Sequence, residues 1–333
     1  MDRIIGIGNA LVDVLVRLEG DDVLARLGLP RGGMQLIDEE RQQDITGQLR
    51  SLRPVRSTGG SAGNAVLALA NLGARPGFIG RVGEDEMGQF FCRNCQEVGI
   101  DARLIVGQGL SGVANTFITP DAERTFATYL GVAGQLQAGD ITPKLLRDYQ
   151  LLHVEGYLVQ NHALIRHICR LAKEQGMRVS IDLASYNVVS ENLSLLRELV
   201  EEYIDIVFAN EEESAAFTGG KTPEQALQEI AGMADVAVVK LGKRGATAMQ
   251  GGHYAMEPGR SENVVDTTAA GDFFAGGFLY ALTCGASLEQ CLRMGTLLAS
   301  RIIQVVGTRL PENQWAEIRT LAHEILEGRG GAL

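Results

Sequence analysis

The sequence predicts an α/β protein with a mostly parallel central sheet, helices on both faces of that sheet and a small β-sheet lid. Short apolar runs rich in Val and Ile alternate with amphipathic helical stretches, a pattern typical of a parallel sheet covered on both faces. Residues 10–37 and 103–128 break this alternation, because they predict strands without intervening helices. We therefore expect a single domain over residues 1–333, with a lid formed by these two insertions.

The individual elements follow from composition and periodicity. Six short apolar runs, several bounded by Gly or Asn, predict buried strands at 3–8, 76–82, 150–158, 177–183, 205–210 and 235–242. Amphipathic stretches predict helices at 61–72, 85–98, 162–175 and 223–233, and three more helices are expected between Gly271 and about Glu327. The lid strands are expected in LVDVLVRL, GGMQLID, RLIVGQ, GVANTFITP and ERTFATYL, with a turn at Pro120-Asp121.

Composition excludes several classes of protein. The chain has 41 acidic and 30 basic residues and a net charge of -11, which argues against a general nucleic-acid binder. No stretch approaches the roughly 20 apolar residues of a membrane span, and the first residues lack the arrangement of a signal peptide. Five scattered cysteines are simplest to explain in a reducing compartment. We expect a cytoplasmic protein that binds neither nucleic acid nor membrane.

Three short motifs predict less than they first suggest. Gly6-Ile7-Gly8 begins a dinucleotide fingerprint, but Leu11 stands where the third glycine belongs. Gly220-Lys221-Thr222 resembles the end of a P-loop, but Ala215 occupies the first glycine position, and a turn after a helix is the simpler interpretation. Cys92 and Cys95 form a CxxC within a predicted helix and lack a second ligand pair for zinc.

The most informative segment begins at Asp266 and reads DTTAAGDFFAGGF. The small residues Ala269, Ala270 and Gly271 run directly into an apolar helix, and Asp272 lies in its first turn. Free backbone N–H groups at a helix N-terminus form an anion site, beside which Asp272 would accept a proton from an attacking hydroxyl. The alternative is structural: Asp272 caps the helix and the small residues permit close packing.

This segment resembles the C-terminal signature of the ribokinase-like PfkB family of carbohydrate and nucleoside kinases. Residues 59–64, GGSAGN, resemble the N-terminal Gly-Gly motif of that family, and ALANLG and GRVGEDEMGQFF continue the resemblance. It covers the chain from Gly8 to about Gly307. Val66 stands where a small or hydroxyl residue is usual, and Ala269 replaces the first glycine of the usual anion hole. The backbone N–H survives this second change.

The resemblance implies a ribokinase-like three-layer fold and an ATP-dependent kinase that transfers the γ-phosphate to a hydroxyl of a small sugar or sugar-like substrate. It places the γ-phosphate at Ala269–Gly271, the catalytic base at Asp272 and part of the nucleotide site at Thr267. It also implies ATP and Mg²⁺ as cofactors, allows a monovalent cation such as K⁺, and suggests a homodimer formed through the lid sheet.

Two further segments match the nucleotide side of the family. Asn210 and Glu213 follow a strand, and the resemblance implies that they organise Mg²⁺ through its waters. The alternative is a helix start with Asn as its cap. Lys240, Gly242 and Gly245 lie at the end of the next strand, where the resemblance places the base and ribose of the nucleotide. The alternative there is a solvated hairpin turn.

The acceptor side is expected around the lid. The resemblance implies that Asp13 accepts hydrogen bonds from substrate hydroxyls, and that Gly59, Gly60 and Asn64 lie across the sugar from it. A carboxylate and an amide suit a polyol chemically, because both can satisfy neighbouring hydroxyls. For Asn64 the alternative is a polar residue in a helix turn. Arg124 is a candidate lid contact to substrate or phosphate, and a solvated hairpin charge is the alternative.

The sequence leaves the acceptor open. A hexose, pentose or sugar acid is one class of acceptor, and a nucleoside is another, because ERTFATYLGVAG and VEGYL resemble adenosine-kinase-like members of the family. A non-catalytic sugar- or nucleotide-binding regulator on the same fold is the third hypothesis. Intact Asp272 and the NEEE segment argue against it.

Overall fold

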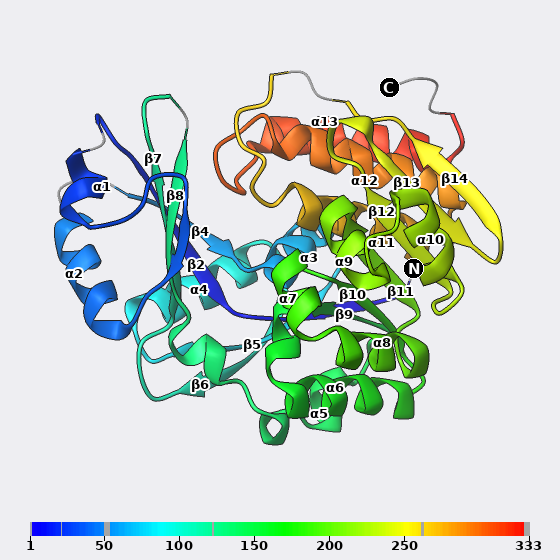
Figure 1. The fold of residues 1–333 in the computed structure, drawn as a ribbon, viewed down its shortest axis with the longest axis horizontal. Helices are drawn as coiled ribbons and strands as arrows, with labels where there is room; N and C mark the ends of the chain where they lie inside the picture. The colour runs from blue at the N-terminus through cyan, green and yellow to red at the C-terminus, as the bar shows by residue number, and fades with distance from the viewer. Residues whose placement is uncertain (1, 21, 50–53, 122, 261–262, 330–333) are drawn as a thin grey trace.

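The computed structural model describes residues 2–20, 22–49, 54–121, 123–260 and 263–329, and it has a large α/β part and a smaller lid (Figure 1). The expected domain also included the chain ends, and the expected lid also included residues 21 and 122. These positions lie outside the described residues.

Within the described residues, the large part is built on one nine-stranded sheet. All neighbouring strands are parallel except β13 and β14, which pair antiparallel at one edge. The predicted mostly parallel sheet is therefore confirmed. Across the sheet the order is β14 (His253–Glu257), β13 (Ala246–Gln250), β12 (Val236–Lys240), β11 (Ile206–Asn210), β10 (Arg178–Asp182), β9 (Leu151–Glu155), β1 (Ile4–Ile7), β5 (Gly77–Gly83) and β6 (Asp101–Gly107).

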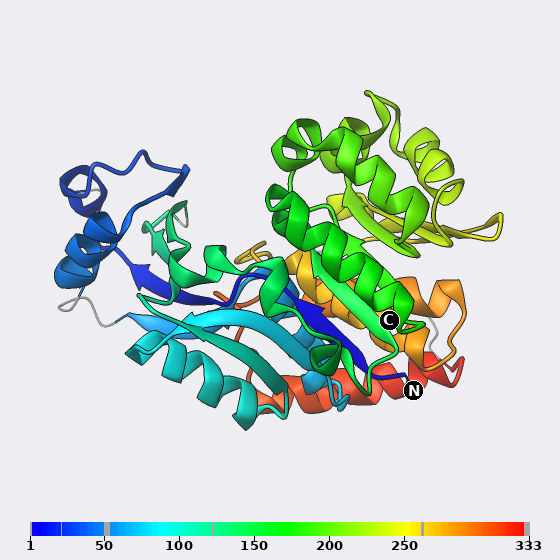
Figure 2. The same cartoon turned by 90° about the horizontal axis from the view of Figure 1, so that it is seen from below.

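Helices cover both faces of this sheet, and Figure 2 shows the green helices on one side and the red α13 on the other. One layer contains α5 (Pro143–Leu146), α6 (His162–Glu174), α7 (Tyr186–Glu191), α8 (Leu193–Glu202), α9 (Glu211–Thr218) and α10 (Pro223–Ala231). The other layer contains α3 (Ser61–Asn71), α4 (Glu86–Glu97), α11 (Ala270–Thr283), α12 (Leu288–Ile302) and α13 (Glu312–Leu326). Short 3-10 helices are formed by Gly131–Gln135, Ala138–Asp140, Gly156–Gln160 and Gly242–Arg244.

The apolar strands are explained by this double coverage. In β11, Val207 and Ala209 pack into the core on the α6 side, whereas Ile206 and Phe208 pack on the α11 side. Successive side chains of a strand point to opposite faces, so a strand covered on both faces needs apolar residues at every position.

The lid is a five-stranded sheet with a different pattern. Its order is β3 (Met34–Leu36), β8 (Arg124–Tyr129), β7 (Gly112–Ile118), β2 (Leu11–Arg17) and β4 (Val55–Gly59). The helices α1 (Asp22–Arg26) and α2 (Glu39–Leu49) lie over one face, where Val12, Val14 and Val16 are buried. The alternation of β2 places Asp13 and Leu15 on the opposite face of the lid.

Four expectations need correction. Residues 103–107 do not form a lid strand, because β6 pairs parallel with β5 after α4 and completes a β-α-β unit of the main sheet. Strand β4 belongs to the lid but was not predicted, because its polar sequence VRSTG does not resemble a strand. Strands β13 and β14 were not predicted at all. The predicted strand at 150–158 ends at Glu155, where a 3-10 helix begins.

Other expectations are confirmed. Cys92 and Cys95 lie on α4, and all five cysteines are free thiols. Gly219 ends α9 in a left-handed conformation, as expected for a turn after a helix at this point. Among the helices that the structure describes, none combines the length and apolar character needed to cross a membrane.

Candidate active site

The start of α11 presents free backbone donors. Ala269 precedes the helix in the left-handed region, with φ 61°, and its carbonyl accepts from the N–H of Phe273 at 2.9 Å. The N–H groups of Gly271 and Asp272 have no acceptor among the described residues. Unpaired N–H groups at the positive end of a helix dipole are an anion site. The structure therefore has the unpaired backbone N–H groups that the predicted anion hole requires.

Asp266 fixes the loop that leads into this helix. Its side chain is buried, with Oδ1 accepting from the N–H of Thr268 at 2.8 Å and Oδ2 from the N–H of Gly307 at 2.8 Å. Arg124 reaches across from the lid, with its Nη1 3.3 Å from Asp266 Oδ1, and it donates to the Val265 carbonyl at 3.0 Å. A buried carboxylate with these partners holds the loop in one conformation.

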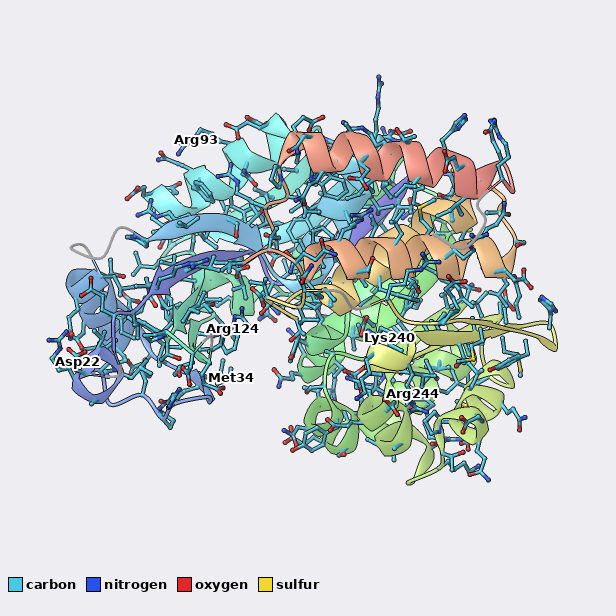
Figure 3. All side chains as sticks on the ribbon, turned by 90° about the horizontal axis from the view of Figure 1, so that it is seen from above. Asp22, Met34, Arg93, Arg124, Lys240 and Arg244 are labelled. Carbon is cyan, nitrogen blue, oxygen red and sulfur yellow. The ribbon has the colours of Figure 1, made fainter. Side chains whose placement is uncertain are left out.

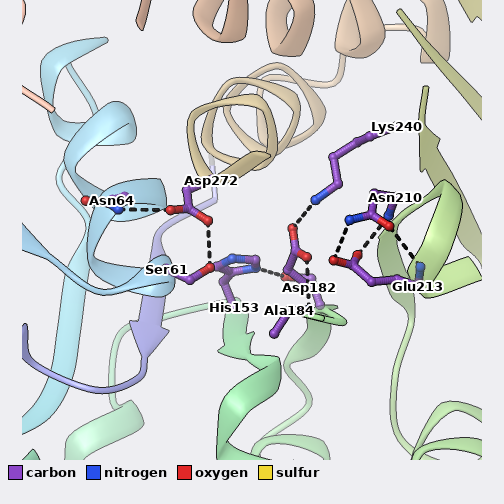
Figure 4. Close-up of polar contacts among 10 residues, drawn as sticks. Ser61, Asn64, His153, Asp182, Ala184, Asn210, Glu213, Lys240 and Asp272 are labelled. Atoms are coloured by element: carbon purple, nitrogen blue, oxygen red, sulfur yellow. Dashed lines mark hydrogen bonds and ion pairs between the residues drawn. The ribbon is translucent and has the colours of Figure 1, made fainter. Parts of the chain in front are cut away.

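Asp272 is held by two donors from α3, the helix that follows the Gly-Gly motif. The Ser61 hydroxyl donates to Asp272 Oδ1 at 2.7 Å, and Asn64 Nδ2 donates to Oδ2 at 2.9 Å (Figure 4). Burial raises the pKa of Asp272 to about 6, although both hydrogen bonds oppose this shift. A carboxylate with a pKa near neutrality can accept a proton and release it again, as a general base must.

A lysine lies directly beside the anion hole. Lys240 Nζ donates to Asp182 Oδ2 at 2.6 Å (Figure 4). It would lie 3.1 Å from a Cβ on Gly271. Burial disfavours the charged amine, but Asp182 and Glu213 outweigh burial and raise the pKa of Lys240. The ammonium group therefore stays charged and can neutralise an anion bound at Gly271.

Polar residues end four neighbouring strands at this edge of the sheet. The register pairs Glu155 of β9 with Asp182 of β10, and Asn210 of β11 with Lys240 of β12. Ligands of open α/β sheets bind outside the carboxyl ends of the strands. The carboxyl edge of the main sheet thus carries two acids, an amide and an amine on neighbouring strands.

Asn210 and Glu213 form a reciprocal capping box at the start of α9. Asn210 Oδ1 accepts from the N–H of Glu213 at 2.8 Å, and Glu213 Oε2 accepts from the N–H of Asn210 at 2.8 Å. Burial raises the pKa of Glu213. The structural alternative, a helix cap, is thus correct. Both residues also line the central cavity, so the cap holds them where a cation bound to phosphate could interact with them.

The turn after β12 is shaped by glycine. Gly242 and Gly245 flank a 3-10 turn that lines the cavity, and Gly245 has φ 99°. A Cβ at Gly245 would collide with the carbonyl oxygen of Glu257. This position therefore requires glycine, which brings the backbone of the turn close to the cavity.

Glu155 holds the Gly-Gly turn in place by accepting hydrogen bonds. Its Oε1 accepts from Asn9 Nδ2 at 2.6 Å and its Oε2 from the N–H of Ala62 at 3.3 Å. Burial raises the pKa of Glu155 to about 7, against the effect of these hydrogen bonds. Gly60, with φ 82°, passes so close to the Asn9 carbonyl that a Cβ would collide with it. This network fixes the turn that carries Ser61 and Asn64.

The acceptor end lies between this turn and the lid. Asp13 extends over Gly59, where a Cβ would collide with the Asp13 carboxylate. Burial, together with the charges of Asp272 and Asp266, raises the pKa of Asp13 to about 7. Asn64 Oδ1 is buried and has no partner in the described chain, so it is an acceptor available to a ligand hydroxyl.

One cavity of ≈ 620 Å³ contains nearly all of these groups. It brings together thirteen of the residues that the sequence predicts: Asp13, Gly60, Asn64, Asn210, Glu213, Lys240, Gly242, Gly245, Thr267, Ala269, Ala270, Gly271 and Asp272. Gly59 and Arg124 are not among the lining residues. Gly59 makes room for Asp13, and Arg124 acts on Asp266, so the predicted direct contacts of both with substrate stay predictions.

Sequence reasoning missed several lining residues. Asp182 was overlooked although it ends a predicted strand, and its place at a strand's carboxyl end was the available signal. Ser61 was quoted within a motif but given no role. Leu15, Phe126 and Tyr157 also line the cavity, and apolar or aromatic residues at such positions carry no motif.

Comparison with known proteins identifies the family. The pattern that defines the "pfkB family carbohydrate kinase" matches residues 34–315. The chain belongs to this family. It is 26% identical to an uncharacterised sugar kinase of Archaeoglobus fulgidus, over 73% of this chain and 97% of the relative.

Solved structures agree with this assignment. A probable sugar kinase from Rhizobium etli CFN 42 superposes with a TM-score of 0.85 and 31% identity, covering 97% of this chain and 98% of that one. The adenosine kinase from Sinorhizobium meliloti gives a TM-score of 0.84 and 31% identity, covering 97% and 99%. The ribokinase-like fold class is confirmed, and this pfkB chain is a kinase, a phosphotransferase that acts on an alcohol group of a small sugar or nucleoside.

Proposed function

We propose that this kinase uses Mg-ATP to phosphorylate a hydroxyl of a small sugar-like acceptor, with Asp272 as the general base. One observation carries the proposal: the Asp272 carboxylate lies at the same helix start as the unpaired N–H groups of Gly271 and Asp272. Donors aimed at a transferring phosphoryl group, next to a base for the attacking hydroxyl, are the two parts that phosphoryl transfer requires.

The residues at the helix start fit the γ-phosphate of ATP. Gly271 leaves its backbone accessible, and the Lys240 ammonium lies 3.1 Å from the point that a Cβ would fill. Ala269, Ala270 and Thr267 line the same cavity and add small, polar or backbone surface. A cation and backbone donors on one side of a site suit the equatorial oxygens of a phosphoryl group.

Asn210 and Glu213 fit a hydrated Mg²⁺ ion. No group of three or more His, Cys, Asp or Glu side chains in the described chain is arranged to hold a metal directly. Mg²⁺ in nucleotide sites usually keeps several waters and binds through one or two carboxylates together with phosphate oxygens. When bound, Mg²⁺ would supply charge neutralisation at the phosphates. The turn at Gly242 and Gly245 would accept the base and ribose of the nucleotide.

The chain's own residues would perform the proton transfer. Ser61 and Asn64 hold the Asp272 carboxylate in a fixed orientation, and Asp272 takes the proton of the acceptor hydroxyl as its oxygen attacks phosphorus. Lys240 and the N–H groups of α11 stabilise charge on the phosphoryl oxygens. Asp13 and the free Asn64 Oδ1 bind other hydroxyls of the acceptor, and the lid excludes water.

An ADP-release assay with purified protein tests this proposal. We expect ADP formation that depends on Mg²⁺ and rises when a sugar or nucleoside is added. Calorimetry with a non-hydrolysable ATP analogue and Mg²⁺ should show binding without an acceptor. Folded protein that fails to bind the analogue would overturn the proposal, and binding without turnover on any acceptor would favour a regulator.

Three accompanying expectations stay predictions: activation by a monovalent cation such as K⁺, a homodimer through the lid sheet, and a cytoplasmic location. Replacing K⁺ by tetramethylammonium in the assay tests the first. Light scattering of the purified chain tests the second, and cell fractionation tests the third.

A further inference from the structure

The nine-stranded sheet ends on one side at β14, and the outer edge of this strand is free. β14 pairs antiparallel with β13, and none of the other described strands pairs with it. Figure 3 shows the β13–β14 hairpin in yellow, projecting past the helices on the side away from Asp22 and Met34 of the lid. The free edge of a strand is a row of backbone donors and acceptors with which another strand can pair.

The opposite edge of the sheet, at β6, is protected in a way that β14 is not. β6 begins at Asp101 and carries Arg103, whose Nη1 donates to the carbonyls of Leu145 at 2.8 Å and Arg147 at 3.1 Å. These contacts tie the segment around α5 to this edge, and charged side chains on an edge strand discourage pairing with another chain. The sequence of β14, HYAME, has no lysine, arginine or proline, so β14 is the less protected edge.

The turn before β14 determines which of its backbone groups point outward. Gly251 and Gly252 connect β13 to β14 with φ of 55° and 81°. Positive φ at both residues of a two-residue connection is typical of a type I′ hairpin, in which the flanking residues exchange backbone hydrogen bonds. Gln250 and His253 are the flanking pair here. From His253 onward, every second residue of β14 therefore bonds to β13, and the residues between them point their N–H and C=O groups away from it.

Tyr254 and Met256 are the residues whose backbone groups point outward. Beyond the strand pairing itself, neither N–H has an acceptor in the described part of the chain. Their side chains are 46% and 51% exposed, although both lie on the sheet face that α10 covers at β13. Ala255 points to the other face and is buried in the core beside α12. The free edge thus carries two donors, two acceptors and two large side chains that are about half exposed.

We propose that β14 pairs antiparallel with β14 of a second copy of this chain, around a two-fold axis that passes beside Ala255. In this register Tyr254 of each copy lies opposite the partner's Met256, and the two residues of each pair exchange backbone hydrogen bonds. Every outward N–H and C=O group of Tyr254 and Met256 then has a partner, and the main sheets of both copies join into one. The inference goes beyond the proposed function and does not depend on it.

The side chains of β14 also suit this register. Tyr254 lies beside the partner's Met256, and contacts between a thioether sulfur and an aromatic ring are favourable. Ala255 lies opposite itself, so no bulky side chain stands at the axis. His253 lies opposite the partner's Glu257, and each also has an ionisable partner in its own chain. The register therefore opposes no like charges, which would destabilise a cross-strand contact.

Neighbouring registers satisfy fewer backbone groups. A shift by two residues in one direction places Tyr254 opposite Pro258, which has no N–H to donate. A shift by two residues in the other direction places Met256 opposite Gly252, which belongs to the turn. A shift by one residue would oppose the outward groups of one copy to groups that already bond to β13. The chain therefore favours the register centred on Ala255.

Light scattering of the purified chain over micromolar concentrations is the first test, and we expect the mass of a dimer. Met256→Pro should raise the dissociation constant at least about tenfold, because it removes one interchain N–H donor from each copy. Proline is tolerated on an edge strand where its nitrogen faces away from the ladder, and circular dichroism checks that the fold persists. Tyr254→Lys should act in the same direction, because lysine discourages edge pairing. Tyr186→Lys replaces an exposed tyrosine on α7 and, as the matched control, should leave the dissociation constant unchanged.

Two results of this first test would overturn the inference. One is the mass of a single chain at every concentration. The other is a dimer that both Met256→Pro and Tyr254→Lys leave intact, and its dissociation by Met34→Ser would assign that dimer to the lid. Should Met256→Pro fail to fold, the comparison of Tyr254→Lys with Tyr186→Lys decides.

Cysteine crosslinking tests the register itself. The Cα atoms of a hydrogen-bonded cross-strand pair lie about 5.5 Å apart, within the range of about 4.4–6.8 Å that a disulfide spans. Identical residues of the two copies lie on a diagonal, about 7–8 Å apart. A mixture of the Tyr254→Cys and Met256→Cys proteins should therefore form a covalent dimer under mild oxidation, and each variant alone should form much less. Any background from the exposed Cys284 appears equally in all three samples. No covalent dimer in the mixture, or as much in each variant alone, would overturn the proposed pairing.

Discussion

The start of α11 and the inner lid face, which is the lid face that carries Asp13 and Leu15, form two walls of one cavity, and they differ in how many of their groups are already paired. At the helix start, Asp266 and Asp272 are each held by hydrogen bonds from different parts of the chain. The inner lid face carries Asp13 together with Arg17 and Arg124, which lie in a neighbouring row of the strand register, and it leaves Met34 exposed. The difference teaches that the helix start, the polar wall, holds its polar groups in place without a ligand, whereas the mostly apolar lid face, the apolar wall, still has surface that a ligand could cover.

The polar wall is tested most strongly by Asp272→Asn, which should lower kcat by about 10²–10⁴-fold through loss of the general base. The fold should survive, because Asn is nearly isosteric and its new NH₂ group can donate to Asn64 Oδ1 once the Asn64 amide turns over. Asp85→Asn is the matched control, since Asp85 caps α4 away from the cavity. If Asp272→Asn kept more than about a tenth of kcat, Asp272 would be a helix cap and not the base.

The polar corner of the lid is tested by Asp13→Ala. Losing a charge-assisted hydrogen bond to a hydroxyl should cost about 1.5–3 kcal/mol, so the acceptor KM should rise about 10- to 150-fold. The KM for ATP should stay constant, as measured by initial rates with each substrate varied in turn. Arg17→Ala, at the exposed end of the same strand, controls for general damage to the lid. A higher KM for ATP with an unchanged acceptor KM would show that Asp13 belongs to the nucleotide side of the cavity and not to the acceptor side.

The connection between the two walls is tested by Arg124→Met. The Arg124 side chain is 15% exposed and its partner Asp266 is 1% exposed, so the pair links the lid to the anion loop in a buried setting. Coupling of about 0.5–3 kcal/mol is typical of such contacts, and we expect kcat to fall and the acceptor KM to rise together. Arg56→Met removes the exposed Arg56–Glu86 pair between the lid and α4 and should change neither. Equal effects of the two variants would deny a special role for Arg124.

The smallest expected effect lies at Ala269. A non-glycine residue in the left-handed region costs about 1–2 kcal/mol, part of which is offset in Ala269→Gly by the greater freedom of glycine in the unfolded chain. The free energy of unfolding in urea should therefore rise by up to about 1 kcal/mol, with kcat unchanged because the N–H remains. Ala270→Gly, at the first residue of the helix and without a positive φ to relieve, should instead lose at most the roughly 0.5–1 kcal/mol that glycine costs in a helix interior. A loss of activity in Ala269→Gly would mean that the methyl group contacts the substrate.

The two walls also differ in how far the sequence predicted them. The polar wall was predicted well, because DTTAAGD and NEEE combine small residues and acids at helix starts, where a physical reason and a family motif coincide. Asp182 was missed because a single acid at a strand end carries no local pattern. Its role comes from the parallel sheet, which brings the end of β10 within reach of the Lys240 side chain at the end of β12.

The apolar wall was predicted poorly. Strand β4 was missed because VRSTG lacks alternation, and 103–107 was misplaced because a β-rich run does not say which sheet it will join. Phe126 and Leu15 were unnoticed as site residues, because only the pairing of β2, β7 and β8 brings them to one face. For Arg124 the predicted contact with substrate or phosphate stays a prediction, and its ion pair with Asp266 was not predicted because the two residues are distant in sequence.

The pH dependence of kcat at saturating acceptor and Mg-ATP tests the central claim most directly. Burial raises the pKa of Asp272 to about 6 in the chain without ligands, and only the ionised form can accept a proton, so kcat should fall at acidic pH. Saturation removes the titration of unliganded Asp13 from the profile, because kcat reports the groups of the bound complex, in which the phosphates and Mg²⁺ also change the pKa of Asp272. We predict that the acidic limb is present in the wild type and absent from the residual activity of Asp272→Asn. The same limb in both proteins would contradict the assignment of Asp272 as the base.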